Sequence, residues 1–336
     1  MSATRRGRTP APSVLRTLAT LTASTLVLAG CGASGGHRAD AHAGAQDRAH
    51  CPRQQRPIAT KEADWQPVAK VLGRTGALRE NVVFGISLPR RDLTVTSRGV
   101  TIGTSLALNG SADFARYCDG TMLMGDLVLT EDELPRAIEA LQEAGIEQTA
   151  LHKHLPDQSP PIWWTHYSAM GDPITLARKL KTVLEVSGDP IAVPPPPSTR
   201  PIDLDTAGIN EALGRKGIAE GRVYKFFIGR GETVTAHGHV LPAPIGVDTV
   251  IKFQALGEER AAVTGDIVMT ASEVQNVIRA LRRGGFEIVE LHNHMLDDQP
   301  RLFYVHYWGI GDGVQLARDL RPALNATNLA APTPGS

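Results

Sequence analysis

The segment that decides the fold occurs twice in the sequence. Residues 125–180 read GDLVLTEDELPRAIEALQEAGIEQTALHKHLPDQSPPIWWTHYSAMGDPITLARKL, and residues 265–320 read GDIVMTASEVQNVIRALRRGGFEIVELHNHMLDDQPRLFYVHYWGIGDGVQLARDL. The two align without a gap at a constant offset of 140, and 23 of the 56 positions are identical. Two copies predict tandem domains or two pseudo-symmetric halves, because a solenoid needs at least three units.

Each copy has the pattern of an α+β fold. DLVLT at 126–130 predicts a strand, and Thr130 is expected to cap the following helix, with Glu133 completing a capping box. This helix carries apolar residues every three or four positions and ends near Gly145. TALHKHL and IWWTHYSAM then predict a hairpin, and a closing helix follows Asp172. Each copy is therefore expected to be a mostly antiparallel sheet with packed helices.

The repeat also sets the expected domain boundaries. Copy 1 spans 60–187 and copy 2 spans 202–326. Between them lies a linker at 188–201 with four consecutive prolines, which predicts a stiff spacer. Residues 327–336 are expected to be a disordered tail.

The N-terminus predicts export and a lipid anchor. Several arginines precede an apolar stretch at 18–30 that is too short to remain as a membrane-spanning helix. The stretch ends in a Leu-Ala-Gly-Cys run that resembles a bacterial lipobox, in which residues 1–30 are removed and Cys31 is lipidated. A secretory signal with an incidental cysteine is the alternative. Residues 31–59 are then expected to be a flexible tether that holds the domains outside the cell membrane.

Composition narrows the possible partners. The 336 residues include 35 basic and 35 acidic side chains, so the formal net charge is +0, and 42% of residues are hydrophobic. A balanced charge without basic clusters argues against a nucleic-acid partner. Two cysteines besides Cys31 remain, Cys51 and Cys118. In an exported protein they either form a disulfide or stay as thiols, and the sequence leaves both open.

The repeated histidines form the candidate site. In a strand, residues i and i+2 project from the same face. If the hairpin pairs residue 154 with residue 166, three imidazoles share that face. Neutral imidazole is the commonest protein metal ligand, and three histidines with an open fourth position form a known zinc site. The candidate ligands of a divalent metal such as zinc are His152, His154 and His166 in copy 1 and His292, His294 and His306 in copy 2.

Two other interpretations of the six histidines stay open, a pocket for a polar ligand and structural hydrogen bonding. Copy 2 alone adds His237 and His239, where the alignment places Arg98 and Val100 in copy 1. A neighbouring strand with this pair could complete a site, which makes copy 2 the better candidate. A surface hairpin is the alternative for this pair.

Repeated carboxylates and aromatic residues lie near the histidines. Asp172 and Asp312 are expected to cap helices. Asp126 and Asp266 are expected in turns rather than as ligands or general bases, whereas Glu287 is the acid nearest a histidine pair. The aromatic residues beside the third histidine of each copy are expected to fill the core rather than line a groove.

These motifs together suggest a family. The runs MGDLVLTEDEL, ALHKHL and LARKL, with TGDIVMTASEV and ELHNHMLDDQPRLFYVHYW in the second copy, resemble the LppY/LpqO-type bacterial lipoproteins. Their repeated domain has no assigned function. The resemblance covers 60–326 and agrees with the lipobox at Cys31. It implies location and architecture, and it brings no catalytic assignment.

Three functional classes follow from the sequence. The leading hypothesis is a membrane-anchored extracytoplasmic lipoprotein that binds a divalent metal or a small polar ligand through its His-x-His hairpins. The alternative is a metal-dependent hydrolase that acts on cell-envelope material. The third is a structural envelope protein with inert histidines. No nucleophile elbow, phosphate-binding loop, H-E-x-x-H or C-x-x-C motif is present.

Overall fold

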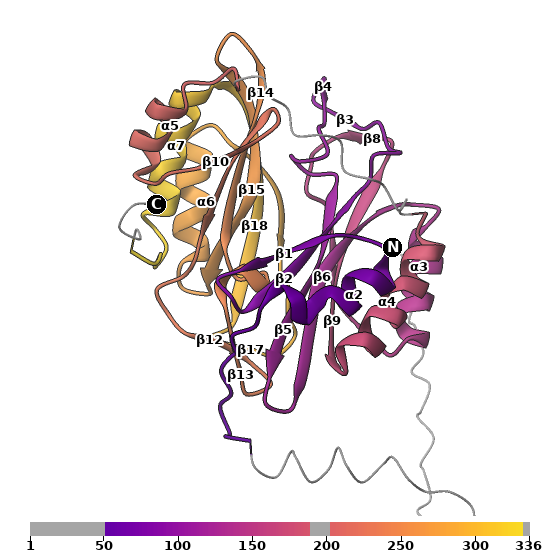
Figure 1. Ribbon diagram of the computed structural model, residues 1–336. Coiled ribbons are helices and arrows are strands. Elements are labelled where there is room, and N and C mark those ends of the chain that lie inside the picture. The colour runs from indigo at the N-terminus through magenta and orange to yellow at the C-terminus, as the bar shows by residue number, and fades with distance from the viewer. Residues whose placement is uncertain (1–50, 189–201, 332–336) are drawn as a thin grey trace, which may run out of the picture. The chain divides into compact units, whose positions relative to one another are not determined.

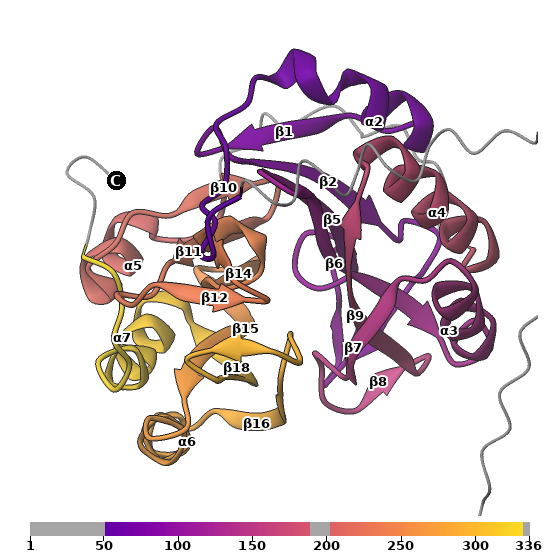
Figure 2. The same ribbon diagram turned by 90° about the horizontal axis from the view of Figure 1, so that it is seen from below.

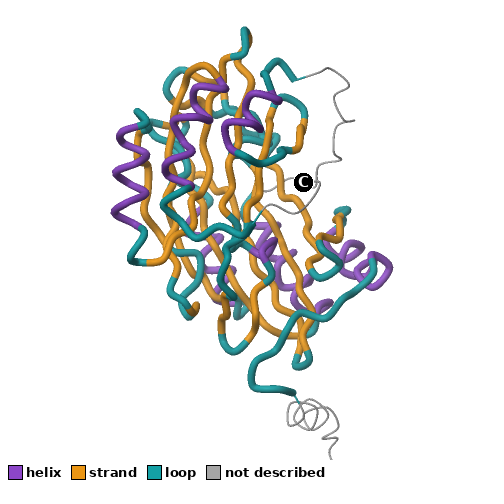
Figure 3. Tube along the Cα trace, turned by 90° about the vertical axis from the view of Figure 1, so that its left-hand side faces the viewer, coloured by secondary structure: helices purple, strands orange, loops and turns teal. Residues whose placement is uncertain are grey.

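Each copy folds around one long antiparallel sheet in the computed structural model, which describes residues 51–188 and 202–331 (Figure 1). The expected signal peptide with Cys31, the expected tether as far as residue 50, the four-proline run and the last five residues lie outside the described residues. Within that range the two tandem halves are rich in strands, and their helices pack on antiparallel sheets as expected (Figure 3).

The two main sheets have the same strand order. Copy 1 has six strands in the order β1-β2-β5-β6-β9-β7, and copy 2 has six in the order β10-β11-β14-β15-β18-β16. The copy 1 strands are β1 (Gly76–Arg79), β2 (Val83–Pro89), β5 (Asn109–Tyr117), β6 (Gly120–Thr130), β7 (Glu147–His152) and β9 (Ile162–Gly171). Those of copy 2 are β10 (Ile218–Glu220), β11 (Val223–Ile228), β14 (Thr249–Gly257), β15 (Arg260–Thr270), β16 (Glu287–His292) and β18 (Leu302–Asp312).

A small three-stranded sheet accompanies each main sheet. Its order is β4-β3-β8 in copy 1 and β13-β12-β17 in copy 2. These strands are β3 (Thr96–Ser97), β4 (Val100–Thr101), β8 (Gln158–Ser159), β12 (Val234–Ala236), β13 (His239–Leu241) and β17 (Asp298–Gln299).

Helices cover one face of each main sheet and leave the other face free. In copy 1 they are η2 (Glu62–Trp65), α2 (Gln66–Leu72), α3 (Leu134–Glu143) and α4 (Pro173–Val186); in copy 2 they are α5 (Thr206–Leu213), α6 (Val274–Arg283) and α7 (Gly313–Leu324). The short η3 (Ala243–Ile245) lies instead between the copies, where it contacts β5. Figure 2 shows α2, α3 and α4 outside one sheet and α5, α6 and α7 outside the other. The helix-free faces of the two sheets meet between them.

The predicted helix starts are confirmed in part. Asp172 and Asp312 each cap a helix, since a carboxylate oxygen of each accepts a backbone N–H three residues later at 2.8 Å. Thr130 does not cap α3, because the residues between it and Leu134 form a turn. The carboxylate of Glu133 nevertheless accepts the backbone N–H of Thr130 at 2.9 Å, which is half of the expected capping box.

The core has four parts. One apolar cluster fills the space between the copy 1 sheet and its helices, and a second fills the corresponding space in copy 2. The other two join the copies: one packs Met122 and Met124 against Val268 and Tyr304, and the other includes Trp164 of copy 1 and Trp308 of copy 2. The helix-free faces are therefore buried against each other, and the two copies belong to one compact unit, residues 45–336.

Both ends of the folded region extend further than the repeat predicted. Cys51 forms a disulfide with Cys118, and the backbone of Gln55 is hydrogen-bonded to residues 238 and 240 of copy 2. The residues from 51 to 59, expected in the tether, are thus bound to the domains. At the other end, Ala330 donates its backbone N–H to Gly229 at 2.8 Å, so the expected tail begins later than residue 327. In the described part of the chain, none of the helices has the length and apolar composition that crossing a membrane requires.

Candidate metal centre

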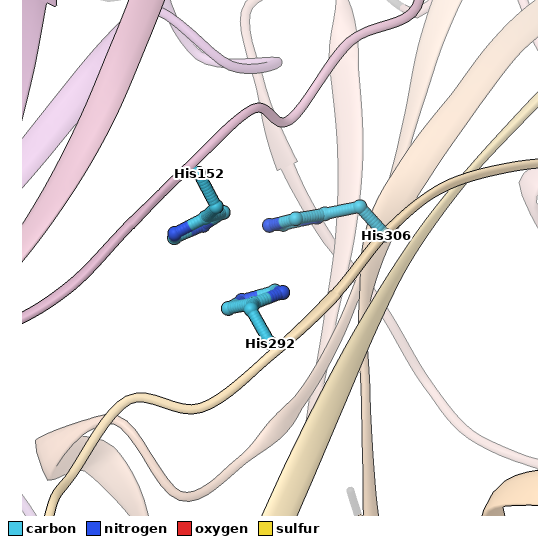
Figure 4. A group of neighbouring side chains, drawn as sticks. All are labelled: His152, His292 and His306. Atoms are coloured by element: carbon cyan, nitrogen blue, oxygen red, sulfur yellow. The ribbon is translucent and has the colours of Figure 1, made fainter. Parts of the chain in front are cut away.

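The six repeated histidines of both copies converge between the two sheets. Three sets of three bring one ring nitrogen each to within 4.8 Å of one another: His152/His292/His306, His152/His154/His166 and His166/His292/His294. Figure 4 shows the first set, in which one ring from copy 1 and two from copy 2 lie nearly parallel. The sequence predicted a site in each copy and preferred the second, whereas the structure brings the two together.

The strand pairing that presents these histidines differs from the expected register. His166 on β9 lies opposite Ala150 on β7, and His152 lies opposite Trp164. Residue 154 was expected opposite residue 166, but His154 lies beyond the end of β7. The predicted common face survives, because a shift of four residues preserves the alternation of side chains.

The contacts between the copies follow a pseudo-twofold axis. His152 stacks on its own counterpart, His292, with ring centroids 3.7 Å apart. His154 lies 3.9 Å from His306, and the equivalent pair, His166 and His294, is also 3.9 Å apart. Each contact between a residue of copy 1 and a residue of copy 2 is therefore matched by the equivalent contact with the copies exchanged, as in an isologous dimer interface.

An aspartate of each copy lies beside the cluster. Asp126 is opposite His166 and Asp266 is opposite His306, and side chains of directly paired strand residues share a face. They were expected in turns, but each lies within a long strand. The preceding glycines are required, because a Cβ at Gly125 would collide with the backbone carbonyl of the neighbouring strand, as would one at position 265.

Asp266 lies among the three histidines of its own copy. One of its carboxylate oxygens is 3.2 Å from Nε2 of His306 and 3.7 Å from Nε2 of His292, and the other is 3.6 Å from Nε2 of His294. None of these contacts has hydrogen-bond geometry, since Oδ1 of Asp266 and the three Nε2 atoms lack hydrogen-bond partners. The three imidazoles therefore surround the carboxylate of Asp266 without forming hydrogen bonds to it.

The imidazoles are held in the neutral form that binds metals. Burial lowers the pKa of all six, and for His294 and His306 it does so to about 3. Nδ1 of His306 lies 2.9 Å from the carbonyl oxygen of Gly265, and Nδ1 of His294 lies 3.1 Å from that of Gly246. A neutral ring that donates from Nδ1 keeps a lone pair on Nε2, which is the usual arrangement for a metal ligand.

A cavity of about 470 Å³ reaches the cluster. Its walls include histidines of both copies together with Asp126, Asp266 and Lys252. Burial raises the pKa of Asp126 to about 6 and that of Asp266 to about 8, and it lowers the pKa of Lys252 to about 8. A ligand in the cavity could therefore contact imidazoles, carboxyl groups and an amine.

Two predicted ligands and one predicted acid lie elsewhere. His237 has φ 50° and is followed by Gly238 at φ 82°, so it forms the two-residue turn between β12 and β13 rather than part of a strand. It pairs with Asp297 at 3.0 Å, and His239 pairs with Asp119 at 2.9 Å. Neither belongs to the close histidine sets. Glu287 binds the guanidinium of Arg98 at 2.7 Å, so Asp266 is the acid beside the histidines.

Most of these aromatic residues fill the core, as expected, whereas Trp163 is partly exposed and contacts Glu131 and Lys153. Trp164 and Tyr304 are fully buried and lie at equivalent positions of β9 and β18. Each stacks on a histidine: Trp164 on His154 at 4.2 Å between centroids, and Tyr304 on His294 at 3.5 Å. They therefore also fix the orientation of the second histidine in each His-x-His pair.

Lys252 is the site residue that sequence reasoning missed. It lies on β14, opposite Thr264, in a region where the two copies differ in sequence. No motif marks it. The aspartates, in contrast, had a signal, since both copies keep a Gly-Asp pair at the same place in the aligned repeat.

Comparison with known proteins identifies the repeated unit. A family model described as Domain of Unknown Function (DUF1259) matches residues 66–186 and again residues 207–326. A comparison with curated proteins gives no match. Among solved structures, the trimeric bacterial microcompartment shell protein PduB aligns with 73% of this chain and 86% of its own, at 10% identity. The TM-score is 0.18, so this likeness supports no structural argument.

Proposed function

The chain belongs to the family of the Domain of Unknown Function (DUF1259), and from its histidine cluster we propose that it binds a divalent transition metal such as zinc. One observation carries the proposal. Ring nitrogens of five of the six histidines are buried without a hydrogen-bond partner, counted over the described residues. Unpartnered buried nitrogens are costly, and a metal ion that accepts their lone pairs removes that cost.

The donor set favours a particular class of ion. Imidazole suits zinc, copper, nickel and iron, whereas magnesium and calcium prefer oxygen ligands. Asp126 and Asp266 add carboxylate oxygens beside the nitrogen donors, and carboxylates also bind zinc. The backbone carbonyls of Gly246 and Gly265 would orient two of the rings as outer-shell partners.

Metal content tests this proposal directly. The purified protein, stripped with a chelator and dialysed against Zn(II), is expected to retain metal and to unfold at a higher temperature than the stripped form. The double variant His292→Ala/His294→Ala should retain clearly less metal than wild type. The matched control is His237→Ala, which removes an exposed histidine outside the cluster and should bind like wild type. No metal in wild type would refute the proposal.

A second candidate function is metal-dependent hydrolysis of cell-envelope material. The cavity favours it, because Lys252, Asp126 and Asp266 line the same space as the imidazoles. A divalent metal supplies Lewis-acid chemistry when it is bound. The amine of Lys252, with a pKa lowered by burial to about 8, can take up or release a proton near neutral pH. Chelator-sensitive release of soluble fragments from isolated envelopes, lost in Asp266→Asn, is the expected result; no release from wild type would remove this candidate.

We also propose that the protein is an exported lipoprotein of the LppY/LpqO type, anchored to the membrane through Cys31. The lipobox supports this, and so does the disulfide between Cys51 and Cys118, because disulfides persist in oxidising compartments. Cys31→Ser should move the protein from the membrane fraction to the soluble fraction. An unchanged distribution would contradict the anchor.

A further inference from the structure

We infer that the cluster forms two metal sites, each built by one copy from its own three histidines and its own aspartate. This inference rests on the proposed function, since it concerns how many ions the cluster binds. The first site consists of the close set His152, His154 and His166 with Asp126. The second consists of the residues at the corresponding positions of copy 2, His292, His294 and His306, which surround Asp266.

The spacing of the rings separates ligands of one ion from neighbours that only stack. A zinc–nitrogen bond of about 2.0–2.1 Å places a ring centroid about 3 Å from the ion, so two imidazoles on a tetrahedral ion have centroids about 5 Å apart. Within copy 1, the centroid of His152 is 4.9 Å from that of His154 and 5.0 Å from that of His166. Within copy 2, His292 is 5.2 Å from His294 and 4.8 Å from His306. All four spacings fit a shared ion.

The closest contacts between the copies do not fit a shared ion. The rings of His152 and His292 stack at 3.7 Å with an interplanar angle of 16°, and those of His166 and His294 stack at 3.9 Å with an angle of 23°. The lone pair of an imidazole lies in the plane of its ring, so rings stacked face to face direct their lone pairs side by side rather than at one point.

This distinction selects one of the three close sets. Each of the two sets that mix the copies contains a pair of rings stacked less than 4 Å apart. In the set from a single copy, His152/His154/His166, the planes of His152 and His166 are also nearly parallel, but the centroid of His152 is 4.9 Å from that of His154 and 5.0 Å from that of His166, which is too far for face-to-face contact. The spacing of 5.2 Å between His152 and His306 would also fit, but the set that includes both of them also requires the stacked His292.

The aspartates complete both sites. Asp266 has a carboxylate oxygen within 3.7 Å of Nε2 of each histidine in its own copy, which places the fourth donor of the copy 2 site. Asp126 has the same strand position relative to His166 as Asp266 has to His306. Duplication therefore gives each copy three histidines and one aspartate at corresponding positions, although in the described residues only Asp266 lies within 4 Å of its histidines. The two sets meet where His152 and His292 stack. The cavity reaches both, because it is lined by both aspartates.

Counting the ions tests this inference separately from the proposed function. Native mass spectrometry of the full protein loaded with Zn(II) is expected to show two ions per chain. His154→Ala and its counterpart His294→Ala should each reduce this to one, and His237→Ala should leave two. One ion in wild type would overturn the two-site inference and leave metal binding standing, whereas none would overturn both.

A spectroscopic measurement on wild type covers the case in which a variant does not fold. Loaded fully with Cu(II), the protein is expected to give the electron paramagnetic resonance signal of a dipolar-coupled pair, because the two sites are adjacent. Partial loading should give more of the isolated signal. Isolated Cu(II) alone at full loading would overturn the inference.

Discussion

The two copies carry the same aspartate in different surroundings. Asp126 lies opposite Ser111, whose hydroxyl donates a hydrogen bond to the carboxylate at 3.1 Å. Asp266 lies opposite Val250, which has no polar side-chain atom to offer. Burial raises the pKa of both carboxyl groups, to about 6 for Asp126 and about 8 for Asp266. The hydrogen bond from Ser111 favours the ionised form of Asp126 and accounts for part of this difference.

A second difference lies on the wall of the cavity. Asp113 of copy 1 and Lys252 of copy 2 have the same place in the strand pairing, opposite residues 124 and 264. Asp113 is neutralised by the guanidinium of Arg79, whereas Lys252 makes no ion pair within the described residues. The histidines and aspartates of the cluster are thus the same in both copies, while these cavity-lining residues differ. The two copies therefore differ in the residues that surround the histidine cluster.

The buried arginines offer the strongest test of how alike the copies are in stability. Arg90 of copy 1 binds Glu133 at 2.7 Å and donates to the carbonyl of Val128 at 2.8 Å, and Arg230 makes the equivalent contacts in copy 2. Either Arg→Ala variant empties a buried position and leaves a partly buried carboxylate without its partner, so each should lower the free energy of unfolding by up to about 3–5 kcal/mol. Urea denaturation of the two variants measures this.

An exposed arginine provides the control for that experiment. The side chain of Arg98 is 45% exposed and pairs with Glu287 on the surface, so Arg98→Ala should lower the free energy of unfolding far less than either buried-arginine variant does. A cost below about 1 kcal/mol for one buried arginine but not the other would show that the copies are stabilised differently.

The local sequence pattern predicted most of the secondary structure of each copy, because secondary structure depends on residues that are close in sequence. The alternation that places His152 and His166 on one face held although the register shifted by four residues. Asp126 was misplaced for a local reason, since its strand begins earlier, at Gly120. His237 was misplaced because it occupies a turn, where the rule that residues i and i+2 share a face does not apply.

The meeting of the two histidine sets could not be predicted in this way. Periodicity indicates that a sheet face is apolar or polar but not which distant surface covers it. The contact between His152 and His292 joins residues 140 positions apart and depends on how two whole sheets pack. Lys252 was missed for a related reason, because it lines a cavity that residues of both copies enclose.

Exchanging the residues that lie opposite Asp126 and Asp266 should reduce the difference in pKa between these two carboxyl groups. It is the smallest effect expected of the variants considered. Ser111→Ala removes the hydrogen bond to Asp126 and should raise the pKa of that carboxyl by up to about one unit, since a hydrogen bond to a charged group contributes about 1.5 kcal/mol. Val250→Ser offers a hydroxyl to Asp266 and should lower its pKa by a similar amount. Carbon-13 NMR of the labelled carboxyl groups during a pH titration of the metal-free protein reads both values.

The double variant Ser111→Ala/Val250→Ser serves as the matched exchange. Folded aspartate pKa values above the ordinary 3.8 mean that these carboxyl groups favour the folded state below that pH and oppose it as the pH rises through each folded value. Raising the pKa of Asp126 should therefore reduce stability at pH 8 and leave it unchanged near pH 4, and Val250→Ser should do the reverse. If the exchange leaves Asp266 titrating two units above Asp126, the opposing residue is not the cause. The difference would then lie in burial and in the distance of each carboxylate from Lys252.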